Sequence, residues 1–139
     1  MSRQTFDGGW IGVDLDGTLA TYTGTTAEIG PPVPAMVLRV KHWLSLGIEV
    51  RIVTARVAAS GLIGDNGAVD DDEFAAFQTA LIRLWCEEHL GQALVATAAK
   101  DFMMAELWDD RAVRVEHDTG RVCSEDACVG GERFGTEPA

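Results

Sequence analysis

The pattern of apolar positions divides the first part of the chain into two strands separated by a helix. The run 11–13 is apolar, and the run 48–54 is rich in β-branched residues and apolar towards its end, which is typical of buried parallel strands. Between them, apolar residues recur at helical spacing over 35–46, and Gly47 is placed to end that helix. A strand, a helix and a strand of this length predict a right-handed crossover with the two strands parallel.

Two stretches rich in small residues are predicted to be loops. The first, 20–34, is rich in Thr, Gly and Pro, and Pro34 suits the first turn of the helix that follows. The second, 56–67, follows the second strand and contains several glycines and alanines. Each of these loops follows the C-terminal end of a predicted strand.

A longer helix is predicted to begin in the acidic run 70–73 and to end at Gly91. Acidic side chains complement the positive end of a helix dipole, so we interpret this run as a helix start rather than a metal site. Trp85 and Cys86 are expected in or near the core. The apolar face of the helix is predicted to consist of Phe74, Phe77, Leu81, Leu84 and Trp85.

The remaining pattern predicts shorter elements. A third strand is expected at 94–97, one or two helical turns at 98–105, and a fourth strand at 106–110 that ends in a carboxylate pair. Alternation over 113–123, around Asp118-Thr119-Gly120, indicates a hairpin. The elements together predict an α/β fold in one domain spanning 1–139, with a core of about 8–125 and a flexible tail over 127–139.

Composition limits the classes of partner. The net charge is −11, from 22 acidic and 11 basic residues. This balance works against sequence-independent binding to nucleic acid or to anionic membranes, although it allows a local basic site for one phosphate.

Three cysteines imply no paired disulfide framework, and their spacing does not suit a zinc site. There is no apolar signal core at the N-terminus and no apolar run of membrane-spanning length. We therefore expect a cytoplasmic protein.

Candidate chemistry begins with Asp14 and Asp16, which directly follow the first strand. A strand period of two places these carboxylates on the same side, where two like charges are unfavourable unless a cation or proton lies between them. A divalent metal site is one interpretation. The other is an ordinary Asp-Gly turn at Gly17, and these residues alone do not separate the two.

Further polar groups follow the other predicted strands, and ligands of open α/β sheets bind at this edge. Phosphoryl transfer requires this combination of a cation site, hydrogen-bond donors and an in-line nucleophile. Mg²⁺ prefers carboxylate oxygens. Asp14 and Asp110 suit that ion, while Thr54 offers a hydroxyl and Lys100 a cation. The groups expected at the edge are Asp14, Asp16, Thr54, Arg56, Lys100, Asp109 and Asp110.

These residues lie in motifs similar to those of the haloacid dehalogenase (HAD) superfamily. Asp14-Leu15-Asp16-Gly17-Thr18-Leu19 matches its DxDGT(L/V) signature, and Ile52-Val53-Thr54-Ala55-Arg56 resembles its second motif. Lys100 falls where the third-motif lysine is expected, and Trp108-Asp109-Asp110-Arg111 resembles the terminal acidic motif. The resemblance runs in order from about residue 11 to residue 115. The Asp-Asp-Arg triplet also resembles the phosphatase domain of bacteriophage polynucleotide kinase.

The resemblance implies a three-layer, Rossmann-like fold around a mainly parallel sheet, without a cap domain. It implies that Asp14 is the nucleophile and a Mg²⁺ ligand, and that Asp16 is the general acid/base and lends its backbone carbonyl to the metal. Thr54 and Lys100 would hold the transferring phosphoryl group.

Two residues keep alternative roles. Asp110 is expected to bind the metal directly, with Asp109 behind it, although the assignment within this pair differs among members of the superfamily. Arg56 is expected either to contact the substrate phosphate or to anchor a nearby carboxylate.

The function implied is Mg²⁺-dependent hydrolysis of a phosphomonoester through an aspartyl-phosphate on Asp14. The alternatives are a nucleotide or polynucleotide 3′/5′-phosphatase, and a HAD-like protein that binds Mg²⁺ or a phosphorylated partner without turnover. Without a cap, the site would accept a large substrate or be closed by a homo-oligomer. A receiver domain fits poorly, because the second strand ends in Thr54-Ala55-Arg56 rather than in a phospho-acceptor aspartate.

Overall fold

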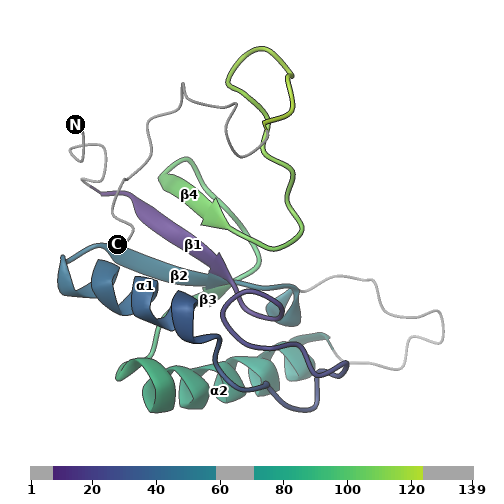
Figure 1. Ribbon diagram of the computed structural model, residues 1–139. Coiled ribbons are helices and arrows are strands. Elements are labelled where there is room, and N and C mark those ends of the chain that lie inside the picture. The colour runs from purple at the N-terminus through teal and green to yellow at the C-terminus, as the bar shows by residue number, and fades with distance from the viewer. Residues whose placement is uncertain (1–7, 59–70, 124–139) are drawn as a thin grey trace.

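The computed structural model describes residues 8–58 and 71–123 (Figure 1). Four parallel strands form one sheet in the order β3-β2-β1-β4. The α/β class and the parallel sheet predicted from the sequence are therefore confirmed. The strands are β1 (Trp10–Asp14), β2 (Glu49–Val53), β3 (Ala96–Thr97) and β4 (Met104–Trp108), and the helices are α1 (Pro34–Ser45), the 3₁₀ helix η2 (Ala55–Val57) and α2 (Asp71–Leu90).

Strand β1 is one of the two central strands of the sheet, and it pairs with both β2 and β4. Val13 stands opposite Ile52 on one side and opposite Trp108 on the other. From β1 the chain moves outward to β2 and β3, and then returns across the sheet to place β4 on the free side of β1. The gap between the ends of β1 and β4 is therefore a topological switch point, where ligands of such sheets bind.

Helix α1 begins and ends where the sequence predicts. Pro34 occupies its first turn, where a missing backbone N–H costs nothing. At the other end, Gly47 has a φ of +81°, and its N–H donates to the carbonyl of Leu44 at 3.0 Å. The N–H of Ile48 donates to the carbonyl of Trp43 at 3.1 Å. This pair of bonds is a Schellman motif, which satisfies the last carbonyls of the helix.

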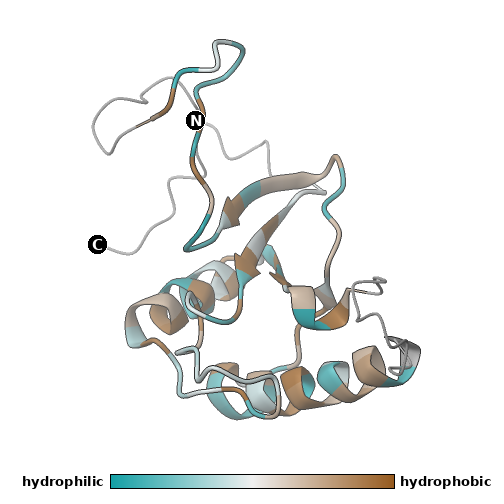
Figure 2. Cartoon of the chain, turned by 90° about the vertical axis from the view of Figure 1, so that its right-hand side faces the viewer, coloured by the Kyte–Doolittle hydropathy of each residue, from teal (hydrophilic) through white to brown (hydrophobic). Residues whose placement is uncertain are grey.

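Helices α1 and α2 pack on the same face of the sheet (Figure 1, Figure 2). Ile11, Val13 and Ile52 from the strands share one core with Val40 and Trp43 of α1 and with residues of α2. The described residues thus form two layers, and no helix among them covers the opposite face of the sheet. The expected third layer is not present in this part of the chain.

The predicted buried face of α2 is wrong. Phe74, Phe77 and Leu84 are exposed, although Trp85 and Cys86 are buried as predicted. The buried stripe is displaced by one residue, about 100° around the helix. It consists of Gln78, Ile82, Trp85, Cys86 and Leu90. Hydrophobicity alone misplaces this stripe because its first member, Gln78, is a polar residue.

The helical turns predicted for 98–105 are not formed. Instead the chain turns at Asp101, whose side chain accepts hydrogen bonds from the N–H of Met103 and the indole N–H of Trp10, both at 2.9 Å. An aspartate that binds its own backbone in this way competes with helix formation. β4 consequently begins at Met104, two residues earlier than predicted.

The segment 113–123 forms the expected hairpin-like return. Val115 and Val122 form an antiparallel bridge, and Asp118 has a left-handed φ of +65° in the turn. Cys123 is disulfide-bonded, which the odd number of cysteines did not predict, and Cys86 is a free buried thiol.

Two predicted segments, the loop over 59–67 and the tail over 127–139, lie outside the described residues. No helix in the described part has the length and apolar character needed to cross a membrane.

Candidate active site

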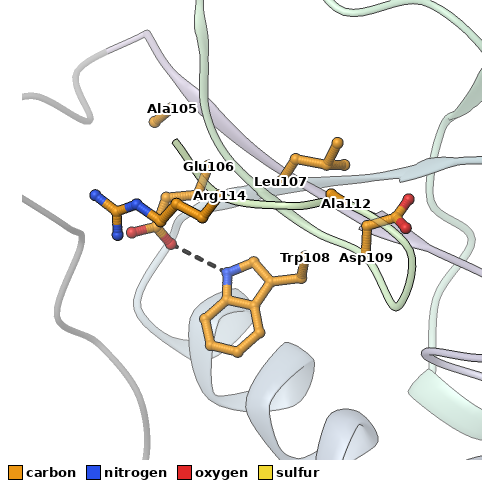
Figure 3. Close-up of a pocket in the computed structure, with 7 residues that line it drawn as sticks. All are labelled: Ala105, Glu106, Leu107, Trp108, Asp109, Ala112 and Arg114. Carbon is orange, nitrogen blue, oxygen red and sulfur yellow. Dashed lines mark hydrogen bonds between the residues drawn. The ribbon is translucent and has the colours of Figure 1, made fainter. Parts of the chain in front are cut away.

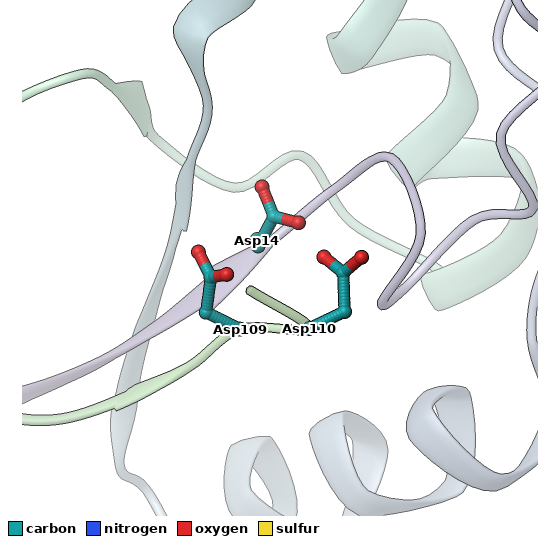
Figure 4. A group of neighbouring side chains, drawn as sticks. All are labelled: Asp14, Asp109 and Asp110. Atoms are coloured by element: carbon teal, nitrogen blue, oxygen red, sulfur yellow. The ribbon is translucent and has the colours of Figure 1, made fainter. Parts of the chain in front are cut away.

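Three carboxylates from opposite ends of the chain meet at the switch point. Asp14 is the last residue of β1, and Asp109 and Asp110 directly follow β4. Each contributes an oxygen to a group in which all the oxygens lie within 4.8 Å of one another. Figure 4 shows the three side chains projecting to the same side of the sheet edge. The parallel pairing of β1 with β4 brings together residues that are about ninety positions apart in the sequence.

Two residues of the turn after β1 shape this cluster. Gly17 has a φ of +93°, and a Cβ at this position would lie 2.7 Å from Oδ2 of Asp110. Only glycine therefore leaves room for that carboxylate. The hydroxyl of Thr18 lies 3.2 Å from Oδ2 of Asp14 and 3.1 Å from Oδ1 of Asp110, so it connects the two acids.

The crowded carboxylates share a proton. Burial, a hydrogen bond with Asp110 and the charge of Asp109 raise the pKa of Asp14 from 3.8 to about 7. The hydrogen bond with Asp14 in turn lowers the pKa of Asp110, with a smaller contribution from the charge of Arg111. Of the two acids, Asp14 is thus the one that holds a proton below about pH 7.

The donor set could hold a divalent metal ion. Mg²⁺, for example, takes oxygen ligands at about 2.0–2.1 Å in an octahedron, so that oxygens on opposite sides of it lie about 4 Å apart, and Ca²⁺ takes them at about 2.3–2.6 Å. Three carboxylate oxygens within 4.8 Å of one another match that size. The raised pKa of Asp14 reflects the same crowding of negative charge that a bound cation would offset. Asp14, Asp109 and Asp110 could therefore hold the metal.

Asp16 lines the same cleft as these three acids and is held by Arg56. The guanidinium donates to Oδ2 of Asp16 from Nε at 2.7 Å and to Oδ1 from Nη2 at 2.8 Å. Arg56 is buried, with only 4% of its surface exposed. Such a two-pronged, buried pair fixes the orientation of the carboxylate.

Protein groups surround the rest of the Arg56 guanidinium. Nη1 donates to Oε1 of Gln78 at 2.8 Å and to the carbonyl of Thr26 at 3.1 Å. Nη2 also lies within hydrogen-bond distance of the carbonyls of Thr25 and Glu28. These bonds occupy all five N–H donors of the side chain. The arrangement matches the anchoring role of Arg56 and leaves no donor for a substrate phosphate.

Thr54 lies at the end of β2, as expected, and is buried. Its side-chain oxygen accepts the backbone N–H of Arg56 at 3.1 Å, which caps η2. No acceptor among the described residues takes its hydroxyl hydrogen, which is thus available to a ligand.

A cleft of about 580 Å³ contains most of these groups. Tyr22, Phe74 and Arg111 form part of its wall, together with the four aspartates, Thr54 and Arg56. Lys100 is exposed and is not among the described residues that line the cleft. The structure therefore brings together six of the seven predicted site residues and leaves Lys100 outside.

A second hollow of about 470 Å³ lies along β4 (Figure 3). Here the indole N–H of Trp108 donates to Oε1 of Glu106 at 3.1 Å, and Arg114 and Leu107 form part of the wall. Asp109 borders both hollows.

Sequence reasoning missed three residues of the site. The spacing of Gln78 from Ile82 and Trp85 is helical, so it indicates that Gln78 lies on the same face of the helix as these two residues. Arg111 directly follows the carboxylate pair, and this adjacency is the signal that places it at the site. Tyr22 lies in a loop without periodicity, and no sequence signal places it at the cleft.

Comparisons of this chain with protein-family models, with characterised proteins and with solved structures found no match.

Proposed function

We propose that this protein is a Mg²⁺-dependent phosphomonoester hydrolase that acts through an aspartyl-phosphate on Asp14, in the manner of a capless HAD phosphatase. The observation that carries the proposal is the meeting of Asp14, Asp109 and Asp110 at the switch point of a parallel sheet, beside an open cleft. The order of the HAD-like motifs along the chain supports the same function.

In the first step, one oxygen of the ionised Asp14 carboxylate attacks phosphorus and forms a P–O bond. The bond between phosphorus and the leaving oxygen breaks, and the leaving oxygen takes a proton from Asp16. Mg²⁺ bound to the three carboxylates would offset the negative charge of the transferring group. Asp14 would have to give up its proton to bind a metal, and its ionised carboxylate would then be available for attack.

In the second step, water attacks the phosphorus of the acyl phosphate and gives its proton to Asp16. The bond between phosphorus and Asp14 breaks, which releases inorganic phosphate and restores the carboxylate. Each oxygen of Asp16 retains a lone pair beside its bond to Arg56, so it can accept this proton while the pair still orients it. The hydroxyl of Thr54 would donate to an oxygen of the phosphoryl group.

Hydrolysis of an aryl phosphate tests the proposal. We expect turnover with Mg²⁺, its loss in EDTA, and its loss in Asp14→Asn, which keeps the shape of the side chain and removes the nucleophile. Activity that survives either the chelator or the substitution contradicts the proposal. Tight binding of beryllium fluoride with no turnover on a broad panel of phosphomonoesters would instead indicate a binding protein.

A nucleotide is the substrate class that a second observation favours. Tyr22 and Phe74 line the cleft and are 59% and 36% exposed, so their rings are accessible to a planar group. Aromatic side chains of this kind stack on nucleobases. We expect Tyr22→Ala to raise KM for nucleoside monophosphates and to leave KM for sugar phosphates unchanged. Equal effects on both substrates would remove the support for a nucleotide.

A further inference from the structure

We propose that Arg111 supplies the positive charge that binds the phosphate of the substrate, in the place where the motif resemblance expects Lys100. The inference rests on the proposed hydrolase function and assigns the phosphate-binding residue of that same site.

Arg111 is well placed for this role. It directly follows the carboxylate pair and lines the same cleft as Asp14 and Thr54. Its backbone N–H donates to Oδ1 of Asp109 at 2.7 Å, which fixes the main chain from which the side chain extends. The side chain itself is exposed and forms no hydrogen bond or salt bridge with another residue in the described part of the chain. Its donors are free for a ligand.

The other candidate cations are not available to a ligand in the cleft. All donors of Arg56 are used by Asp16, Gln78 and backbone carbonyls. Lys100 is exposed and absent from the described lining. Arg111 is consequently the one cationic side chain with free donors in the described wall of the cleft.

The charge balance of the cleft makes such a residue necessary. Four aspartates line it, and three of them share the proposed metal site. One divalent ion does not neutralise three carboxylates and a phosphate dianion, so a further cation is required to hold the anion. A guanidinium suits this purpose, because its parallel N–H groups match two phosphate oxygens.

The experiment compares Arg111→Ala and Arg111→Lys with Lys100→Ala and with Lys41→Ala, a substitution on α1 that serves as the surface-charge control. We expect Arg111→Ala to lower kcat/KM for an aryl phosphate by about 10- to 100-fold, as for loss of a charged hydrogen bond. Arg111→Lys should recover part of this loss, and added guanidinium should partly rescue Arg111→Ala. Each lysine variant should remain within about two-fold of the unsubstituted protein, as is usual for an exposed charge.

A second measurement separates this inference from the function on which it rests. Calorimetric titration with inorganic phosphate in the presence of Mg²⁺ requires no turnover. If the unsubstituted protein binds phosphate and Arg111→Ala binds it at least ten times more weakly, the inference stands even where no hydrolysis is found. Equal phosphate binding by both proteins overturns it. A loss of kcat/KM in Lys100→Ala with none in Arg111→Ala also overturns it, and leaves the hydrolase function intact.

Discussion

Arg56 donates hydrogen bonds to both carboxylate oxygens of Asp16, from Nε to Oδ2 at 2.7 Å and from Nη2 to Oδ1 at 2.8 Å. The Arg56 side chain is almost fully buried. This ion pair links the turn after β1 to η2, which contains Arg56. The hydrogen bond from Arg56 to Gln78 links η2 to α2. The acid assigned to proton transfer is therefore oriented by residues from three parts of the chain. Asp14, in contrast, faces other acids.

Removal of Arg56 should strongly destabilise the fold. Arg56→Ala leaves a carboxylate and several carbonyls without donors, and breaking a buried pair in this way costs about 3–5 kcal/mol. Chemical denaturation measures the change in the free energy of unfolding. Arg83→Ala is the matched control, because its ion pair with Glu87 is exposed and is expected to contribute only about 0.3–0.5 kcal/mol. Similar losses in both variants would show that the Arg56 network does not support the fold.

Gln78 should contribute to stability through Arg56. Gln78→Leu keeps the approximate volume of the side chain but removes the acceptor of an Nη1 hydrogen at 2.8 Å. A buried donor left without a partner costs about 1–3 kcal/mol. Leu84→Ala, on the exposed side of the same helix, is the control and should change the free energy of unfolding much less. A neutral or stabilising effect of Gln78→Leu would contradict this role.

The absence of a side chain at Gly17 should be required for metal binding, in addition to the positive φ that glycine permits there. Gly17→Ala places a methyl group 2.7 Å from the Asp110 carboxylate and should displace it. Gly24 provides a close control, because its φ of +90° is nearly the same and a Cβ there would meet nothing within 4 Å. Both variants should lose similar stability, of about 1 kcal/mol from backbone strain. Only Gly17→Ala should lose Mg²⁺ affinity by calorimetry, and equal affinities would refute the steric argument.

The raised pKa of Asp14 predicts an unusual pH dependence for the metal-free protein. Folded Asp14 keeps its proton up to about pH 7, whereas the unfolded chain releases it near 3.8. Between these values the folded state binds more protons, so its stability falls as the pH rises. The lowered pKa of Asp110 acts in the opposite direction, but only below its ordinary value.

Thermal unfolding in EDTA should therefore give a Tm that decreases between about pH 4 and about pH 7, the interval between the two pKa values of Asp14. Asp14→Asn should flatten this profile. Mg²⁺ should raise Tm more at the upper end of the range, since the metal competes with the proton. A profile that is flat in the unsubstituted protein would show that the carboxylates do not share a proton.

Much of the fold could be predicted from the sequence because its signals are local. The apolar run before Asp14 and the helix from Pro34 to Ser45, with Gly47 after its end, are set by hydrophobicity and by turn chemistry. The pairing of Asp14 with Asp109 and Asp110 also followed, since parallel strands bring their ends to one edge.

The errors have nonlocal causes. Gln78 is buried and accepts a hydrogen bond from Arg56, and the hydrophobic pattern of α2 does not mark a polar residue as part of the core. The turn at Asp101 depends on Trp10, which lies at the other end of the chain in sequence. The sequence predicts helical turns over 98–105, and it places Lys100 at the end of the third strand. Lys100 instead lies outside the cleft, which leaves Arg111 as the available cation.

Identification of the phosphorylated residue tests the central claim most directly. The protein is mixed with Mg²⁺ and an aryl phosphate, quenched in acid within the first turnovers, digested, and analysed by mass spectrometry. We predict one phosphoryl group on the peptide that contains Asp14, removed by hydroxylamine and absent from Asp14→Asn. Turnover without any phosphorylated carboxylate, or with the phosphoryl group on another residue, would contradict the proposed mechanism.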